Sequence, residues 1–219
     1  MQASINIIPH HLDKKTALSI VHSLAKSSKM PCHSYSISAK ICITGKALRN
    51  VLNSVCSKCY ALKGRYSFPN VQNALNKRAE AFDNPLFETA MVSLITHFKE
   101  DYFRWFDSGD LQNIAMLHKI ANIAQRTPNT LHWLPTREYK IVDDYIDIYG
   151  SFPENLLVRV SSHLIDESAP KRFSHTSEVH NCTASPHAHS CPAPTQNNQC
   201  NNCRACWDTN VKTISYTEH

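Results

Sequence analysis

Glycine is scarce in this chain, because only four occur in 219 residues. A phosphate-binding loop needs several glycines at fixed spacing, and neither G-x-G-x-x-G nor the P-loop sequence is found. Long apolar runs are missing as well, since no stretch approaches the roughly 18 residues that a membrane-spanning helix requires. These absences exclude the common nucleotide-binding motifs and predict no association with a membrane.

A targeting signal at the amino terminus is also missing. Residues 1–15, MQASINIIPHHLDKK, contain no basic region followed by an apolar core. We therefore expect a cytoplasmic protein, in a reducing compartment where disulfides are rare. Nine cysteines in such a protein are better interpreted as metal ligands or catalytic thiols.

The charge of the chain is modest, with a net value of +5 and no dense Lys/Arg stripe. This balance permits contact with nucleic acid without indicating it. The hydrophobic content of 42% is ordinary for a globular protein. We expect one domain over residues 1–219, divided into a Cys-rich segment (28–68), helices with β/α units (70–163), and a long loop with a Cys-rich end (165–219).

The first half of the chain predicts helices around an irregular segment. Residues 13–27 place Leu18, Val21, Leu24 and Ala25 on one face of an amphipathic helix. Residues 30–68 show little apolar periodicity and need cross-links to stay ordered. Helical spacing returns after Asn70, the expected N-cap, and again from about Pro85.

Strands and helices then alternate between residues 102 and 163. Short apolar strands are expected at Tyr102–Phe106, Thr130–Leu134 and Leu156–Val160, with amphipathic helices between them. Three strand-then-helix units predict a parallel sheet with right-handed crossovers. We therefore expect an α/β fold, an incomplete (β/α) barrel-like parallel sheet whose Cys-rich irregular ends are joined by a metal site.

Polar residues follow each predicted strand, where parallel α/β folds place their ligand sites. Asp107 and His163 are the candidate general acid or base. The candidate substrate-binding residues are Arg104, Ser108, Arg137, Glu138 and Arg159. Alternatively, Asp110 and Thr136 cap helices, and the mid-strand arginines Arg104 and Arg159 pair with Asp107 and Glu138 inside the fold.

The densest group of cysteines lies near the carboxyl end. Residues 165–199 read as a long polar loop, followed by Cys200-x2-Cys203-x2-Cys206, with Cys191 upstream. Bacterial ferredoxins use a related C-x2-C-x2-C run for a cubane cluster. A two-knuckle zinc site needs only C-x2-C pairs, so the third cysteine favours iron–sulfur.

A second group of cysteines lies in the amino-terminal half. Cys56-x2-Cys59 with Cys42 forms a three-ligand set with one open position. Either one cluster takes ligands from both ends of the chain, or each set holds its own. Cys32 and Cys182 are interpreted as bystanders, and the loop histidines His180, His187 and His189 as solvated side chains.

On these residues the chain resembles the phage-encoded gene product 88 family. The matching stretches are Cys56–Val71, Arg104–Gln112, His132–Val142, Pro153–Ser161, Cys191–Trp207 and Ile214–His219. The resemblance supports seven metal ligands, Cys42, Cys56, Cys59, Cys191, Cys200, Cys203 and Cys206. The segment Cys59-Tyr60-Ala61 is also similar to phage proteins related to the radical-SAM barrel. The C-x3-C-x2-C motif of true radical-SAM enzymes is absent here, so cleavage of S-adenosylmethionine does not follow from the resemblance and stays an open question.

Three functions follow as hypotheses. The first is a phage-encoded [4Fe-4S] protein in the host cytoplasm, acting as an enzyme on a small molecule at the strand ends. The second is a zinc-stapled module for nucleic acid or a host partner, in which aromatic and basic side chains contact bases. Its candidate side chains are Tyr60, Tyr66, Phe68, Trp207, Lys58, Lys63, Arg65 and Arg204. The third is a redox-sensing effector that acts on the host through a protein interface.

Overall fold

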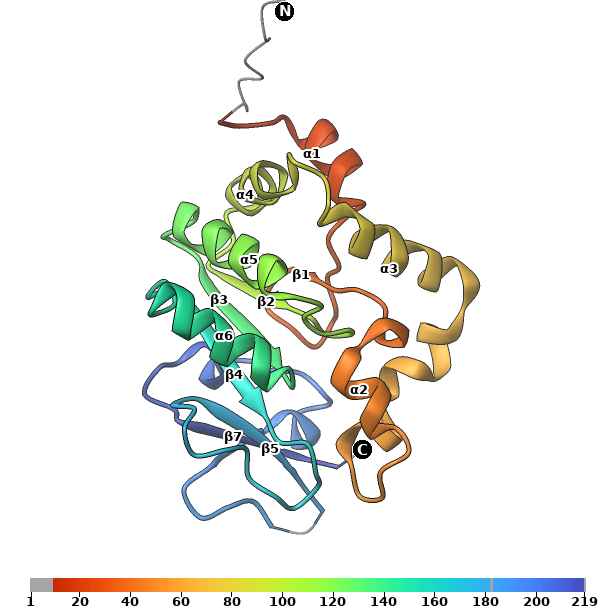
Figure 1. Ribbon diagram of the computed structural model, residues 1–219, viewed down its shortest axis with the longest axis vertical. Coiled ribbons are helices and arrows are strands. Elements are labelled where there is room, and N and C mark those ends of the chain that lie inside the picture. The colour runs from red at the N-terminus through yellow and green to blue at the C-terminus, as the bar shows by residue number, and fades with distance from the viewer. Residues whose placement is uncertain (1–9, 182, 219) are drawn as a thin grey trace, which may run out of the picture.

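The protein has a mixed α/β architecture, seen in a computed structural model that describes residues 10–181 and 183–218 (Figure 1). Its centre is a seven-stranded sheet of order β1-β2-β3-β4-β5-β7-β6, in which every pairing is parallel. The strands are β1 Ser34–Tyr35, β2 Tyr102–Trp105, β3 Leu131–Thr136, β4 Leu156–Ser161, β5 Thr176–His180, β6 His189–Ser190 and β7 Thr213–Thr217. The described α-helices are α1 Lys14–Val21, α2 Ile43–Leu48, α3 Pro69–Ala81, α4 Phe87–Phe98, α5 Ile114–Arg126 and α6 Tyr139–Tyr149. Short 3-10 turns are η1 Ala39–Ile41, η2 Val55–Lys58, η3 Tyr60–Leu62, η4 Gly64–Ser67, η5 Ala193–Thr195 and η6 Ala205–Trp207.

Two of the three predicted strand-then-helix units are confirmed as β2-α5 and β3-α6. The third predicted strand is confirmed as β4, which is followed by β5 without a helix between them. Right-handed crossovers between neighbouring strands place their helices on the same face of the sheet. Phe103 and Trp105 of β2 point to this face and belong to one large core with Leu117 and Ile120 of α5. This face is therefore closed by the helices (Figure 1).

The opposite face of the sheet carries a smaller apolar cluster. Its buried members are Met30, Cys32, Trp133 and Trp207, with Tyr102 of β2 packed against them. Because side chains alternate along a strand, Tyr102 and Phe103 face opposite sides of the sheet. The irregular ends of the chain therefore cover the face that the helices leave open.

The interpretation of residues 165–199 as one long loop is wrong. β5 and β6 lie within it, and β7 follows the last cysteines. β5 was not predicted because its buried residues Ser177, Glu178 and His180 are polar. Ser177 shares a hydrogen bond of 2.8 Å with Ser161, and His180 shares one of 2.6 Å with Ser215 of β7. Polar pairing between strands replaces the apolar alternation that marks a strand in sequence.

Two helix boundaries also differ from the prediction. α1 ends at Val21, because His22 adopts a left-handed conformation (φ 57°), so Leu24 and Ala25 lie outside the helix. α3 starts at Pro69, which places Asn70 inside the helix and not at its N-cap. Proline is well suited to the first helical position, since its missing N–H has no partner there.

The sheet is open, with β1 and β6 as its edge strands. Among the residues that the structure describes, no helix combines the length and apolarity needed to span a bilayer.

A buried histidine in β3 makes the stability of this fold sensitive to acid. His132 is fully buried, and its Nδ1 accepts a hydrogen bond of 3.2 Å from the indole N–H of Trp105. Indole nitrogen only donates, so the ring proton resides on Nε2, 2.8 Å from Thr127 Oγ1. Burial lowers the pKa of His132 to about 3. The folded protein therefore holds this ring neutral at pH values where the unfolded chain protonates it.

We expect the free energy of unfolding to fall by about 1.4 kcal/mol per pH unit below roughly 6.5 through this residue. The sign follows because a histidine with a lowered folded pKa contributes stability above its unfolded pKa and loses it as the pH falls. Urea unfolding of wild type and His132→Gln at pH 7.5 and pH 4.5 measures the effect. The variant should show the smaller loss on acidification, whereas exposed His187→Gln should behave as wild type. Equal losses in wild type and His132→Gln would contradict the assignment.

Candidate functional site

A cavity of about 480 Å³ lies at the carboxyl ends of the parallel strands. The strands contribute wall residues from β2, β3, β4, β5 and β7, including Arg104, Trp133, Ser161, Glu178 and Tyr216. We call this cavity the central pocket. It occupies the position that ligand sites take in parallel α/β folds.

The amino-terminal thiols gather around the start of α2. Cys42 is the residue that precedes this helix, and Cys56 and Cys59 lie on and directly after η2. A methyl group at Gly45 would lie 3.7 Å from Sγ of both Cys42 and Cys56. The two sulfurs therefore face a common space that exists because residue 45 has no side chain.

Burial controls the protonation of these thiols. Burial, together with the neighbouring Asp110, Cys59 and Cys56, raises the pKa of Cys42 to about 12. Burial also raises the pKa of Cys56. Thiols in such surroundings become thiolates only when a cation or metal compensates their charge.

The carboxyl-terminal thiols form a second set on the other side of the central pocket. Cys200 is anchored by its N–H, which donates to the Lys29 carbonyl at 2.9 Å, and Cys191 by its N–H to the Ser215 carbonyl at 2.8 Å. Cys203 Sγ lies 3.6 Å from Nε2 of His189. Burial raises the pKa of Cys206 to about 11, although the hydroxyl of Tyr216, 3.5 Å from its sulfur, lowers it.

Both thiol sets border the same cavity. Its wall includes Cys56 and Cys59 from the first set and Cys191, Cys200 and Cys206 from the second. In the described part of the chain, no three His, Cys, Asp or Glu side chains converge tightly enough to hold a single metal ion. Cys32 is buried among Met30, Trp133 and Trp207, and Cys182 lies outside the described residues.

Arg104 lies in the pocket wall without an anionic partner. Its guanidinium stacks 4.6 Å from the Trp133 ring, Nη1 contacts Met30 Sδ at 3.8 Å, and its buried Nε has no hydrogen-bond partner. No carboxylate among the described residues forms an ion pair with it. Burial disfavours its charge, yet the nearby Tyr60 and Asp107 raise the pKa of Arg104 on balance. A buried cation of this kind suits an anionic ligand.

The turn after β2 supplies further wall residues. Asp107 accepts a hydrogen bond from the Ser36 hydroxyl, and Ser108 donates to the Ile37 carbonyl at 2.9 Å. Asp110 does not cap α5, since Asn113 has that role. Its carboxylate accepts from Thr136 Oγ1 at 2.6 Å and from the Arg137 N–H at 2.9 Å. These contacts lock the turn to the ends of β1 and β3.

Arg137 is the second cation in the pocket wall. Its Nε donates to the Ser162 carbonyl at 3.1 Å, which holds the side chain in place.

Two of the candidate site residues, Glu138 and His163, stabilise neighbouring segments and do not line the central pocket. Both carboxylate oxygens of Glu138 accept from Thr44, at 2.9 Å from its N–H and 2.7 Å from its hydroxyl, which fixes α2 behind Cys42. His163 stacks on Tyr139 with ring centroids 4.0 Å apart, and its Nε2 lies 2.9 Å from the Arg137 carbonyl.

Arg159 lies beneath the carboxyl-terminal thiols. Its guanidinium is fully buried and donates to the carbonyls of Ala205, Cys206, Asp208 and Lys212. The alternative in which Arg104 and Arg159 form ion pairs with Asp107 and Glu138 is not seen among the described residues. Arg159 therefore holds the turn that carries Cys206, since four of its five N–H donors bind carbonyls of residues 205–212.

Several wall residues were missed in the sequence. Glu178 and Tyr216 lie on β5 and β7, two of the four strands that were not predicted, and Met30 precedes the first cysteine. Gly45 follows Cys42 by three residues, a spacing that places both on the same face of a helix. A glycine at this spacing was the signal in the sequence that space is left beside the Cys42 sulfur. Trp207, proposed as a stacking residue, is buried and donates its indole N–H to the Phe103 carbonyl at 3.0 Å.

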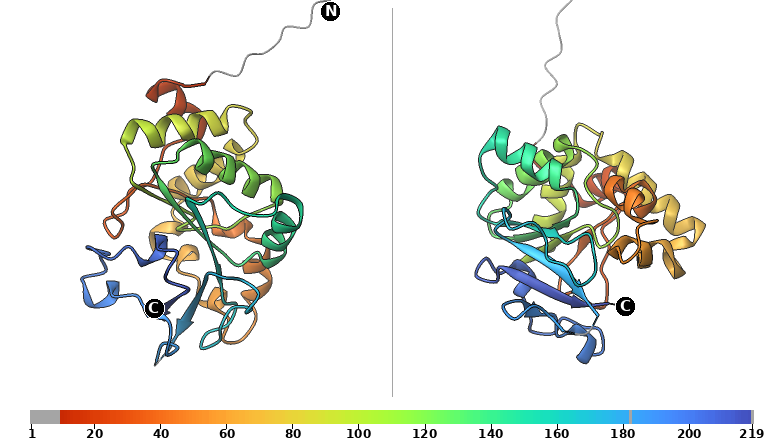
Figure 2. Two further views of the ribbon diagram at one scale, coloured as in Figure 1. Left: turned by 90° about the vertical axis from the view of Figure 1, so that its left-hand side faces the viewer. Right: turned by 60° about the horizontal axis from the view of Figure 1, so that its bottom comes forward.

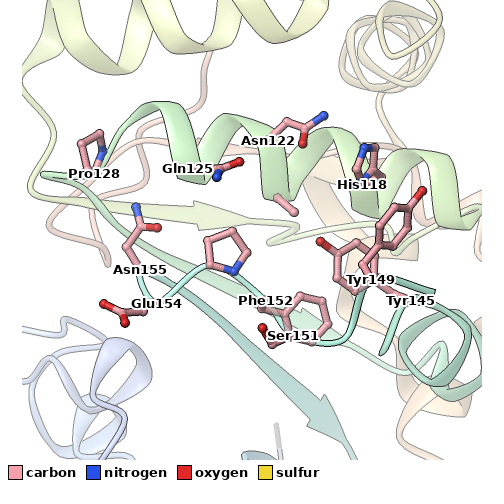
Figure 3. Close-up of a pocket in the computed structure, with 12 residues that line it drawn as sticks. His118, Asn122, Gln125, Pro128, Tyr145, Tyr149, Ser151, Phe152, Glu154 and Asn155 are labelled. Atoms are coloured by element: carbon pink, nitrogen blue, oxygen red, sulfur yellow. The ribbon is translucent and has the colours of Figure 1, made fainter. Parts of the chain in front are cut away.

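A second hollow of about 520 Å³ lies between α5 and α6, away from the thiols (Figure 3). His118 of α5 stacks on Tyr149 of α6 with centroids 4.4 Å apart, and Tyr145 stacks on Phe152. No cysteine and no arginine lines it. The central pocket is therefore the better candidate for chemistry.

Comparison with known proteins gives one family. A family model described as gene product 88 matches residues 10–209. No curated protein and no solved structure is significantly similar to the chain.

Proposed function

We propose that this chain, which belongs to the gene product 88 family, holds an iron–sulfur cluster of the [4Fe-4S] type beside the central pocket. The observation that carries the proposal is that both thiol sets border one cavity at the strand ends. The ligands would come from Cys42, Cys56, Cys59, Cys191, Cys200, Cys203 and Cys206. Either the two sets share one cluster or each holds its own.

The donor set supports a metal. The missing side chain at Gly45 leaves room between the sulfurs of Cys42 and Cys56. Burial raises the pKa of Cys42, Cys56, Cys200 and Cys206, so their thiolates need a strongly positive partner. Several thiolates gathered in this way select soft metals, above all iron–sulfur clusters or zinc.

The scaffold supports an incomplete barrel of the radical-SAM-like kind. Strands β1 to β5 follow one another in chain order, with their connecting helices on one face. A sheet built in this way curls around its uncovered face, as in a (β/α) barrel. The central pocket would then be the mouth of the barrel.

The pocket suits an enzyme that acts on a small anionic molecule. Arg104 and Arg137 would bind its carboxylate or phosphate, since guanidinium groups bind such groups through paired hydrogen bonds. Asp107 would hold or move a proton in the same wall. When bound, the cluster would supply one-electron transfer or an iron with an open ligand position.

Anaerobic purification tests this proposal. We expect brown absorption near about 400 nm and about four iron and four sulfide per chain, or about eight of each if there are two clusters. Cys56→Ala and Cys206→Ala should lower the iron content, whereas Cys32→Ala, a change outside both thiol sets, should leave it unchanged. EPR spectra of the reduced protein and a zinc assay complete the measurement.

A colourless protein with about one zinc and no sulfide per chain would contradict the iron–sulfur proposal and favour the zinc-stapled module. Iron that persists in both Cys56→Ala and Cys206→Ala would contradict the assignment of ligands. Thermal melting of each variant shows whether it is folded, which distinguishes a variant that has lost only the cluster from one that has unfolded.

A further inference from the structure

The charges of this chain are strongly segregated. Residues 14–79 contain twelve Lys and Arg and no Asp or Glu. Their formal charge is therefore +12, and the rest of the chain carries −7, which together give the net +5. The modest overall charge conceals a strongly basic stretch and an acidic remainder.

The fold gathers much of the basic part on one side. α2, α3 and the turns between them lie together, on the side away from α5 and α6 (Figures 1 and 2). We call the surface of residues 40–77 the basic face. Its exposed cations are Lys40, Lys46, Lys58, Lys63, Arg65 and Lys77.

These cations are mostly unneutralised. Of the Lys and Arg side chains in residues 14–79, only Lys58 forms an ion pair with a described carboxylate, that of Glu218. A surface with this much uncompensated charge attracts polyanions and concentrates them locally.

Two aromatic rings stand among these cations. Tyr60 and Phe68 are each 54% exposed, and they flank Lys63 and Arg65 in sequence. Tyr60 is held in place because its hydroxyl donates to the Asp107 carbonyl and its ring packs on Tyr66, with centroids 5.9 Å apart. Exposed rings that alternate with cations are the elements with which proteins stack bases and bind the backbone of single strands.

We propose that the basic face binds single-stranded nucleic acid and leads the strand past the mouth of the central pocket. Lys58 and Tyr60 belong to both, since they also line the pocket. The cations bind phosphates, and Tyr60 and Phe68 stack on bases. This inference does not depend on the cluster, because none of these side chains is a proposed ligand.

Fluorescence anisotropy with a labelled thymidine oligonucleotide of about 20 nucleotides tests the proposal at about 50 and 200 mM salt. We expect binding at the lower salt that weakens about tenfold or more at the higher. The double variant Lys63→Ala with Arg65→Ala should weaken binding about tenfold. The slope of log affinity against log salt concentration should also fall by about two, because two phosphate contacts are lost. Phe68→Ala should weaken binding with little change in the salt dependence, because a ring releases no counterions.

The matched control removes two cations from the other side of the molecule. Lys140→Ala with Lys171→Ala should bind as wild type, since both residues lie outside the basic face. The proposal is overturned if wild type does not bind at the lower salt, or if the control weakens binding as much as Lys63→Ala with Arg65→Ala. Tighter binding of the matching duplex than of the single strand would also overturn it. Circular dichroism melting establishes that each variant is folded.

Discussion

Gly109→Ala should destabilise the protein by at least about 3 kcal/mol and disrupt the central pocket. Gly109 lies in the turn after β2 with φ +81°, a conformation that other residues adopt only with strain. An added Cβ would lie 2.4 Å from Ile37 Cγ1 and 2.7 Å from the Ile37 carbonyl oxygen. The backbone of residue 37 must then move, which breaks the hydrogen bonds between Ile37 and Ser108. Urea unfolding measures the loss, and the iron bound at the proposed cluster site reports the damage to the pocket.

Gly150→Ala is the matched control for this change. Gly150 has the same φ of +81°, but nothing lies within 4 Å of an added Cβ. The control should therefore lose only the strain energy, about 1–3 kcal/mol and less than Gly109→Ala loses, and keep the wild-type occupancy of the proposed cluster site. Equal losses for the two variants would show that the contact with Ile37 is unimportant.

Arg159→Met should be the second damaging change, with an expected loss of about 3 kcal/mol or more in the free energy of unfolding. Methionine fills a similar space but leaves the carbonyls of Ala205, Cys206, Asp208 and Lys212 without their donor, and that of Ala205 is buried. An unsatisfied buried acceptor costs about 1–3 kcal/mol, offset in part because the buried charge is removed as well. The turn that carries Cys206 should loosen, and faster hydrogen exchange in residues 203–212 would report this.

Arg159→Lys provides the comparison. It keeps the charge but cannot reach all four carbonyls at once, because an ammonium is a compact donor on a flexible stem. The free energy of unfolding of Arg159→Lys should lie between those of wild type and Arg159→Met. A methionine variant within about 0.5 kcal/mol of wild type would contradict the structural role of Arg159.

The sequence predicted the central part of this fold and the candidate cysteines. Apolar strands followed by amphipathic helices produce a local pattern, and the parallel arrangement follows from the short connections between them. The wall residues Asp107 and Arg137 were found because polar residues follow these strands, and Arg104 was found because a charged residue in the middle of a buried strand needs an anionic partner. A running count of charge along residues 14–79 would also have revealed the basic face, which the net charge concealed.

Other features were outside the reach of local patterns. β5 was missed because its buried residues are polar and pair with polar partners on β4 and β7. The mid-strand Arg159 looked like a substrate ligand, and only the contacts with residues 205–212 revealed its structural role. His163 and Glu138 likewise follow strands, yet their side chains point to Tyr139 and α2.

The sequence alone therefore determined the parallel α/β class and the spacing of the cysteines, since both depend on residues close together in the chain. Only the tertiary structure decided that Cys56 and Cys206 border the same pocket and that Arg104 faces it without a partner. The physical reason is that these relations arise from packing between distant segments on the face of the sheet that the helices leave uncovered. The periodicity and spacing of residues indicate which way a side chain faces. Which residue of a distant segment it contacts is decided only when the chain folds.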